Sequence, residues 1–310
     1  MANNSNLHYS KREQEDEFYT ELSTIEKELP FYEKHFKDKV IYCNCDDPSF
    51  SQFWKYFYTN YGNLGLKGLY ATYLSSKPYM YFYNGGKVIK TPISNGSYDS
   101  EECMHILEQA DIVVSNPPYS TFKNYMDMLI NNDKKFIILG NLNSVTYTNI
   151  MPLITAKKLW LGVNAGHYWF KVPEWYEEKK TDFKIDETGQ KWRRMGNICW
   201  YTNLDVSERH TEIPLNAEYN ESIPKCTNLD AIFIRYVADI PNNYDGDMAV
   251  PITILPKLSP DQFELRGFDK ELTDNKGRVK LLIDGQEKTQ YARVIIRRKA
   301  DVGNAQAWNR

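Results

Sequence analysis

The sequence predicts an α/β protein with a parallel, doubly wound sheet in the part of the chain up to about residue 205. Short apolar runs such as residues 40–43 are typical of buried strands, because both faces of a parallel sheet are covered. Helical segments separate these runs, and strand–helix–strand alternation implies parallel neighbours. Polar residues follow some of the strands directly, at the ends where sheets of this kind bind ligands.

The individual elements follow from local signals. A capping box that begins at Ser23 opens a short helix, which ends near Pro30. Ser100 caps a later helix, and residues 79–83 and 87–89 form a predicted hairpin around two glycines. The other predicted elements are strands at 40–43, 69–74, 136–139, 158–163 and 197–202, a strand that begins at Asp111, and helices at 49–58 and 121–130.

The composition limits the class of protein. Hydrophobic residues make up 42% of the chain, which is enough for a core, and no apolar run is long enough to span a bilayer. The N-terminus lacks the apolar segment of a signal peptide. The five cysteines lack the spacing of zinc ligands, so we expect no metal site and free thiols in a reducing cytoplasm. Because the net charge is −3, any nucleic-acid surface has to be a local patch.

The most informative segment is Asn116-Pro117-Pro118-Tyr119, which follows a short apolar strand. The Asn116 side-chain oxygen accepts hydrogen bonds, and neither proline has a backbone N–H. The carbonyls of Asn116 and Pro117 can therefore face a ligand as acceptors in a stiff loop. Such a pair suits a planar –NH2 group, and the Tyr119 ring offers a surface for stacking a heterocycle. The same four residues could also be an ordinary turn.

These residue types suit methyl transfer to an exocyclic amine. The amine of a nucleobase is a poor nucleophile because its lone pair is delocalised into the ring. Two acceptors that hold both N–H bonds favour a pyramidal nitrogen, which can attack the methyl of a sulfonium donor. Preorganised groups of this kind contribute about 3–4 kcal/mol each. The segment is therefore typical of an amino-methyltransferase, with Asn116, Pro117, Pro118 and Tyr119 as its catalytic residues.

A second polar loop, Cys45-Asp46-Asp47-Pro48, ends the first strand, where a glycine-rich nucleotide loop would normally lie. Two carboxylates at a strand end could bind the ammonium group and ribose hydroxyls of the donor. Asp47 or Pro48 could equally be a helix cap and a first-turn proline. The sequence leaves both interpretations open.

Several motifs occur in a specific order along the chain, and together they resemble the EcoRI-like adenine-specific DNA methyltransferases over nearly its whole length. The motifs are residues 16–20, 42–48, 116–120, 140–146, 200–205, 244–253 and 293–299.

The resemblance implies a Rossmann-like methyltransferase core with a mostly β target-recognition region. It also implies methyl transfer from S-adenosylmethionine to the N6 amine of a flipped adenine in DNA, as in restriction–modification or an orphan or phage modification system. Ser97 stands where relatives carry an acidic residue. The residues expected to bind the cofactor are Phe18, Tyr19, Thr20, Asn44, Asp46, Asp47, Pro48, Ser97 and Tyr98.

Candidate DNA contacts lie in the polar segments that follow. Lys191, Arg193 and Arg194 surround a tryptophan, and this mixture suits phosphate contact plus base stacking, although a solvated loop is an alternative. Asn141 and Asn143 follow another strand and could contact DNA or cap the next helix. The basic run at residues 297–299 could meet phosphate or be a surface charge run.

We place the catalytic core at residues 1–205 and the target-recognition region at 206–310, with a boundary that can interleave. We expect a cytoplasmic monomer that acts on double-stranded DNA and does not associate with a membrane. Where a cognate restriction endonuclease exists, we expect it to form no stable complex with this protein. Two alternatives stay open. One is the same chemistry on RNA, cytosine or a protein glutamine. The other is a DNA-binding protein that has lost catalysis, which Ser97 suggests.

Overall fold

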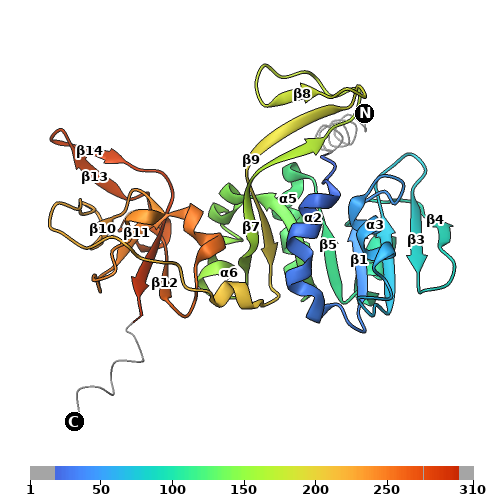
Figure 1. The fold of residues 1–310 in the computed structure, drawn as a ribbon, viewed down its shortest axis with the longest axis horizontal. Helices are drawn as coiled ribbons and strands as arrows, with labels where there is room; N and C mark the ends of the chain where they lie inside the picture. Colours follow the sequence, from blue (N-terminus) through green and yellow to red (C-terminus); the bar gives the residue numbers. More distant parts are fainter. Residues whose placement is uncertain (1–17, 275, 300–310) are drawn as a thin grey trace, which may run out of the picture. The chain divides into compact units, whose positions relative to one another are not determined.

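The computed structural model describes residues 18–274 and 276–299. The chain divides into two compact units, and Figure 1 labels many of their helices and strands. The first unit takes the chain up to Asn149 together with Leu159–Val206, and the second takes Ile150–Lys158 together with the chain from Ser207 onward. Each unit has its own sheet, and each is described by itself.

The first unit is built on a nine-stranded sheet whose four central strands, β2, β1, β5 and β6, are parallel. Antiparallel strands flank them, with β3 and β4 beyond β2, and β9 and β7 beyond β6. The predicted α/β class is confirmed. The strands are β1 (Val40–Asn44), β2 (Gly68–Thr72), β3 (Tyr79–Tyr83), β4 (Ile89–Pro92), β5 (Ile112–Ser115), β6 (Lys135–Asn141), β7 (Trp160–Lys171), β8 (Phe183–Ile185) and β9 (Lys191–Thr202).

Helices cover both faces of the parallel strands. On one face, Phe53 of α3 joins Ile41 and Cys43 of β1 in the main core cluster. On the other face, the Tyr125 hydroxyl of α5 donates a hydrogen bond to the side chain of Asn44. Successive residues of β1 therefore point to opposite helical layers, as the pleat of a strand requires. The helices are α2 (Leu22–Glu28), α3 (Gln52–Thr59), α4 (Glu101–Gln109) and α5 (Phe122–Asn131), with the shorter 3-10 helices η1 (Leu29–His35), η2 (Tyr119–Thr121) and η3 (Leu142–Thr146).

The two predicted helix caps have different outcomes. Ser100 is the N-cap of α4, and its hydroxyl accepts a hydrogen bond from the Cys103 N–H at 3.3 Å, so this prediction is confirmed. The capping box at Ser23 is wrong, because α2 begins at Leu22 with Glu21 as its N-cap. Ser23 lies inside the first turn instead, where its hydroxyl cannot cap the helix.

A buried carboxylate holds an irregular part of β7. The register between β7 and β9 shifts between Leu161 and Ala165, which leaves backbone N–H groups of β7 without strand partners. Glu28 at the end of α2 accepts hydrogen bonds from the N–H groups of Val163 and Asn164, each at 2.9 Å. Burial raises the pKa of Glu28, although these hydrogen bonds oppose the shift. The carboxylate thus satisfies donors that the bulge leaves unpaired.

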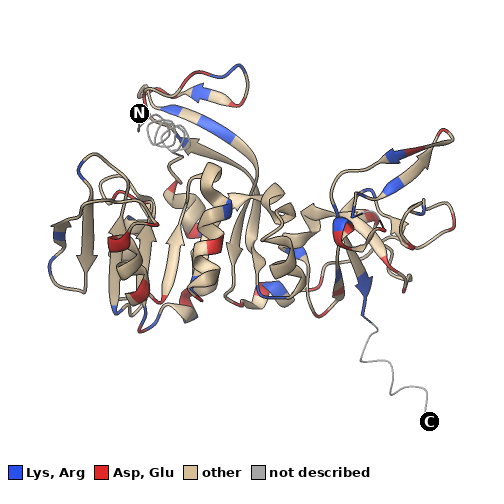
Figure 2. Ribbon diagram, turned by 180° about the vertical axis from the view of Figure 1, so that it is seen from behind, with Lys and Arg blue, Asp and Glu red and all other residues tan. Residues whose placement is uncertain are grey.

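Beyond this point, β7 and β9 continue as an arm, here called the β7–β9 arm (residues 166–194). The sequence predicted strands only at 158–163 and 197–202, but β7 runs to Lys171 and β9 begins at Lys191. β8 pairs with β9, so the polar stretch at 174–194 contains strands and the solvated-loop interpretation is wrong. Figure 2 shows several Lys and Arg segments on this arm.

The second unit is mostly β, as predicted. Its four-stranded sheet has the order β10-β11-β15-β12, in which β10 and β11 are parallel, and β13 and β14 form a separate hairpin. The strands are β10 (Ile232–Phe233), β11 (Met248–Pro251), β12 (Phe263–Phe268), β13 (Lys280–Ile283), β14 (Gln286–Thr289) and β15 (Arg293–Arg298). The helices are short: α6 (Met151–Thr155), α7 (Asp269–Leu272), η4 (Ser207–His210), η5 (Val237–Asp239) and η6 (Ile252–Lys257).

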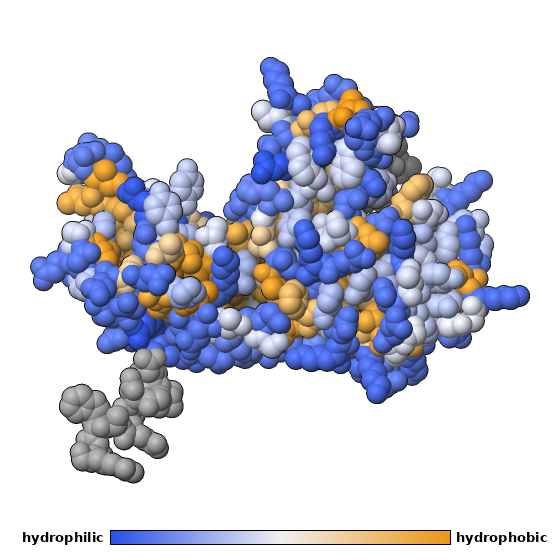
Figure 3. All heavy atoms as spheres, in the orientation of Figure 1, coloured by the Kyte–Doolittle hydropathy of each residue, from blue (hydrophilic) through white to orange (hydrophobic). Residues whose placement is uncertain are grey.

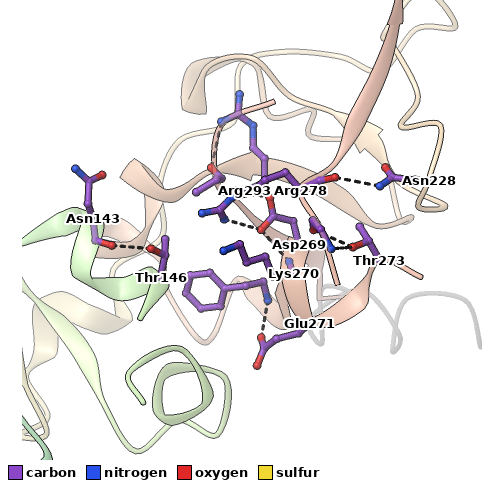
Figure 4. A network of polar contacts seen from close by, with 12 residues as sticks. Asn143, Thr146, Asn228, Asp269, Lys270, Glu271, Thr273, Arg278 and Arg293 are labelled. Atoms are coloured by element: carbon purple, nitrogen blue, oxygen red, sulfur yellow. Dashed lines mark hydrogen bonds and ion pairs between the residues drawn. The ribbon is translucent and has the colours of Figure 1, made fainter. Parts of the chain in front are cut away.

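Asp269 is the centre of a polar network in this unit (Figure 4). Its fully buried carboxylate accepts hydrogen bonds from Arg278 Nη1 at 2.9 Å and from the Arg293 N–H at 3.2 Å. The Arg293 guanidinium also lies over the Phe233 ring, 4.6 Å from its centroid. These contacts connect α7, β15 and the segment before β13, so both arginines act within the fold.

None of the described helices is long and apolar enough to cross a membrane. The face drawn in Figure 3 is largely hydrophilic, with smaller hydrophobic areas among the polar side chains, consistent with a mean hydropathy of −0.60. Scattered apolar side chains of this kind are normal on a protein surface.

Candidate active site

A pocket lies at the carboxyl ends of β1 and β5. These strands are parallel neighbours, and the chain leaves β1 toward β2 on one side while β5 pairs with β6 on the other, which makes their junction a switch point of the sheet. Such junctions are the usual ligand site of doubly wound folds. The pocket encloses about 550 Å³, part of it open to solvent. Its lining consists of Phe18, Tyr19, Thr20, Cys45, Asp46, Asp47, Phe50, Ser51, Gln52, Phe53, Asn116 and Pro118.

Asp46 follows β1 and is 8% exposed. The chain turns into this loop at Cys45, whose φ of 63° is rarely adopted by residues other than glycine. The Asp46 carboxylate accepts hydrogen bonds from the hydroxyls of Ser115 at 2.8 Å and Ser51 at 3.0 Å. Burial, with a smaller contribution from the neighbouring Asp47, raises its pKa to about 7, although the hydrogen bonds from the two hydroxyls oppose the shift.

Asp47 shapes the loop between β1 and α3. Its side chain accepts a hydrogen bond from the Ser49 N–H at 2.8 Å, and its carbonyl accepts one from the Ser51 N–H at 2.7 Å. The N-cap of α3 is Ser51, whose hydroxyl accepts from the Trp54 N–H at 3.3 Å. The alternative in which Asp47 caps the helix and Pro48 occupies its first turn is therefore wrong. Asp47 caps a turn and lines the pocket.

Asn116 presents an unpaired acceptor. Its Nδ2 donates a hydrogen bond to the Phe18 carbonyl at 2.6 Å, and this fixes the orientation of the amide, because the opposite orientation would place two oxygens together. The Asn116 Oδ1 atom is buried and has no hydrogen-bond partner among the described residues. A buried acceptor without a donor is costly, by about 1–3 kcal/mol, unless a ligand supplies the donor.

The segment Phe18 to Thr20 forms one wall of the pocket and is held by β7. The N–H of Tyr19 donates to the Lys171 carbonyl at 3.0 Å, and the Lys171 N–H donates to the Tyr19 carbonyl at 3.3 Å. The Thr20 hydroxyl is buried in this wall without a partner among the described residues. Asp16 and Glu17, from the same motif, lie outside the residues that the structure describes.

Some predicted site residues lie outside this pocket lining. Tyr119 packs its ring against Phe18, with centroids 5.7 Å apart, and Pro117 is buried beside it. Asn44, whose side-chain oxygen is bonded by Tyr125, and Tyr98, whose ring is 5.0 Å from that of Tyr125, lie on the α5 side of the sheet. Pro48 and Ser97 are the other two predicted site residues that are not part of the pocket lining.

Ser97 belongs to a loop that is pressed against the end of β2. A Cβ on the preceding Gly96 would lie 1.9 Å from the Tyr73 carbonyl oxygen, so only glycine fits there. The Ser97 hydroxyl donates a hydrogen bond to the Asp99 carboxylate at 2.5 Å. Ser97 and Asp99 are thus joined within this loop, and neither residue is part of the pocket lining.

Sequence reasoning missed the groups that surround Asp46. Ser51 and Ser115 bond its carboxylate, and Phe50, 64% exposed, lines the pocket 6.3 Å from the Tyr19 ring. Ser115 directly precedes Asn116, so a hydroxyl at the very end of the strand was the available signal. Its pairing with Asp46 depends on the alignment of β1 with β5, which no local pattern encodes.

The predicted DNA contacts have partners within the fold. The Asn141 side chain caps η3 by accepting a hydrogen bond from the exposed Asn143 at 2.9 Å. Lys191 Nζ donates to the Tyr176 carbonyl at 2.9 Å, Arg193 Nη1 to the Thr181 carbonyl at 2.5 Å, and Arg194 pairs with Asp182 at 3.4 Å. In the run at 297–299, Arg297 pairs with Asp247 at 2.8 Å. These pairs constrain the side chains and leave DNA contact a prediction.

Within residues 18–274 and 276–299, no group of three or more His, Cys, Asp or Glu side chains is placed to hold a metal ion. Cys43, Cys103, Cys199 and Cys226 are buried free thiols, and Cys45 is partly exposed in the pocket lining.

The fold and the pocket together define an α/β protein with a ligand pocket at the switch point of its sheet. The buried acceptor Asn116 Oδ1 belongs to a residue of the same lining as the carboxylates of Asp46 and Asp47. The family model described as "Adenine-specific methyltransferase EcoRI" matches residues 6–87 and 87–299 of the chain. The chain therefore belongs to the EcoRI-like adenine-specific methyltransferase family, and it is an adenine-specific DNA methyltransferase.

Individual relatives cover almost the same span. The Type II methyltransferase M.EcoRI of Escherichia coli is 44% identical in an alignment 324 residues long, which covers 96% of this chain and 98% of the relative. M.MpnI of Mycoplasma pneumoniae is 35% identical over 84% of this chain and 85% of its own length. M.MgeORF184P of Mycoplasma genitalium is 35% identical over 83% of this chain and 84% of its own length. No solved structure gives a significant match.

Proposed function

We propose that the protein methylates the N6 amine of a flipped adenine at a specific site in double-stranded DNA, with S-adenosylmethionine as the donor. The observation that carries this proposal is the buried Oδ1 of Asn116, an acceptor with no partner among the described residues, oriented by the bond from Nδ2 to Phe18. An exocyclic amine supplies the N–H that such an acceptor lacks.

The donor fits the pocket by its chemistry. The pocket lies at the switch point of the sheet, where doubly wound folds usually bind small molecules. Asp46 and Asp47 would hold the ammonium group and ribose hydroxyls, and the unpaired hydroxyl of Thr20 supplies a further polar contact. When bound, S-adenosylmethionine supplies an electrophilic methyl group on a sulfonium.

The protein contributes orientation and preorganised dipoles. Asn116 Oδ1 and the Pro117 carbonyl accept the two N–H groups of the amine, which localises the lone pair on nitrogen without prior deprotonation by a side chain. Each well-placed group of this kind contributes about 3–4 kcal/mol. Tyr119 then stacks on the extruded base, whose unstacking costs a few kcal/mol.

The remaining parts of the proposal concern the biological setting. Residues 1–205 act as the catalytic core and 206–310 recognise the target, apart from the Ile150–Lys158 segment that belongs to the second unit. The enzyme works as a cytoplasmic monomer in site-specific DNA modification. Any cognate endonuclease recognises the same DNA site without a stable protein complex.

The test is methyl transfer from labelled S-adenosylmethionine to duplex DNA, RNA and protein in parallel, followed by mass spectrometry of the digested nucleosides. The expected product is N6-methyldeoxyadenosine in DNA alone, with Asn116→Ala as the inactive control. Label in RNA, cytosine or protein would replace the DNA–adenine assignment, and donor-independent DNA binding without transfer would favour a relative that has lost catalysis.

A further inference from the structure

The second unit contains a pocket that is formed by its own residues. It lies after β10 and β11, whose carboxyl ends meet at one edge of the sheet because the two strands are parallel. The pocket encloses about 670 Å³ and is open to solvent. Its lining consists of Arg235, Tyr236, Val237, Pro251, Thr253 and Lys257, and contains no carboxylate.

The two cations of this pocket differ from most others in the unit. Arg278 is bonded to Asp269 at 2.9 Å, Lys280 pairs with Glu287 at 3.1 Å, and Arg297 pairs with Asp247 at 2.8 Å.

Arg235 and Lys257, by contrast, are exposed, and their side chains make no hydrogen bond or ion pair with any residue in the described ranges. Like charges that share a pocket repel each other, and a bound anion removes this repulsion. The arrangement therefore favours an anionic ligand.

The other lining groups indicate which anion. A planar guanidinium can bind phosphate through two N–H groups, and an ammonium adds a point charge. Thr253 supplies a hydroxyl, a common donor to phosphate oxygens. Tyr236 is 64% exposed, so its flat ring is available to pack on a sugar. Cations, hydroxyl and exposed ring together match a phosphate attached to a sugar better than a small free anion.

We infer that Arg235 and Lys257 grip one backbone phosphate of the DNA duplex, with Thr253 as an added donor and Tyr236 against the neighbouring deoxyribose. This inference rests on the proposed function, because the phosphate belongs to the DNA substrate. It assigns a positioning contact that carries no sequence information, so it strengthens binding to every duplex equally.

The experiment measures how DNA affinity depends on salt. Fluorescence anisotropy with a mixed-sequence duplex of about 30 base pairs gives the slope of log K against log salt concentration, which reflects about 0.9 per phosphate contact. The Arg235→Gln/Lys257→Gln double variant should lower the magnitude of this slope by about 0.9 and weaken binding about eightfold at 0.1 M salt. Lys270→Gln, an exposed lysine of α7 outside the pocket, is the matched control and should leave the slope unchanged.

Further variants separate the ring from the charges. Tyr236→Ala should weaken binding several-fold without changing the slope, and Tyr236→Phe should bind as the wild type does. An unchanged salt slope in a folded double variant, beside a wild type that methylates DNA, would overturn the pocket assignment alone. A wild type that neither binds nor methylates DNA would overturn the proposed function itself.

Discussion

Replacing Asn116 by alanine should remove most of the methyl-transfer rate while leaving the fold intact. Asn116 Oδ1 is buried and has no protein partner to compensate for its loss, so the amine would lose one of its two acceptors. Removal of one preorganised group in a buried site lowers kcat by about 100- to 1,000-fold, or about 2.7–4 kcal/mol. Because Asn116 is only partly buried at the end of β5, the free energy of unfolding should change little.

The assay is a rapid-quench single turnover with saturating duplex and labelled donor, which isolates transfer from product release. Asn116→Asp is the informative companion variant, because it keeps an acceptor but replaces Nδ2 by an oxygen, 2.6 Å from the Phe18 carbonyl. It should retain more transfer than alanine and bind the donor more weakly, since Phe18 lines the proposed donor pocket. A near-normal turnover rate in a folded Asn116→Ala protein would refute the role given to this side chain.

Three further predictions follow from contacts in the first unit. Because burial raises the pKa of Asp46 to about 7, donor binding that uses its ionised form should strengthen about tenfold from pH 6 to pH 8, and calorimetry of Asp46→Asn should show a flat profile. Tyr119→Phe should remain active and Tyr119→Ala should bind matched duplex worse than a duplex with a mismatch at the target, as reported by a fluorescent base analogue; an inactive Tyr119→Phe with normal donor binding would contradict stacking. Glu28→Gln should lower the free energy of unfolding by about 2–4 kcal/mol in urea titrations at pH 7, because an amide NH2 then faces the donors of Val163 and Asn164; unchanged stability would show that the bulge does not depend on the carboxylate.

The parts of the site that depend on neighbouring residues in sequence could be predicted. Asn116 and Asp46 follow apolar strands directly, and the parallel alternation of elements brings the ends of such strands to one edge of the sheet. The Ser100 cap was predictable for the same local reason.

The parts that depend on tertiary pairing could not be predicted. The bond from Ser115 to Asp46 requires the register that aligns Tyr42 with Val113. Lys191 lies in a strand because β9 pairs with β7 across the arm, where the next residue, Trp192, pairs with Lys171. Ser23 failed as a cap because the helix already begins at Leu22, with Glu21 as its N-cap, and local propensity barely separates two starting points that differ by two residues.

The two backbone hydrogen bonds between Tyr19 and Lys171 join the wall of the pocket to the β7–β9 arm. The Tyr19 side of the pair forms a wall of the proposed donor pocket, and the Lys171 side is the end of β7 in the β7–β9 arm. A ligand that shifts either side acts on the same two hydrogen bonds. By thermodynamic reciprocity, any change in donor affinity caused by a ligand on the arm must be matched by an equal change in the affinity of that ligand caused by the donor. The two backbone hydrogen bonds are thus a direct contact between the wall of the pocket and the arm, and the reciprocity can be measured by titrating each ligand in the presence of the other.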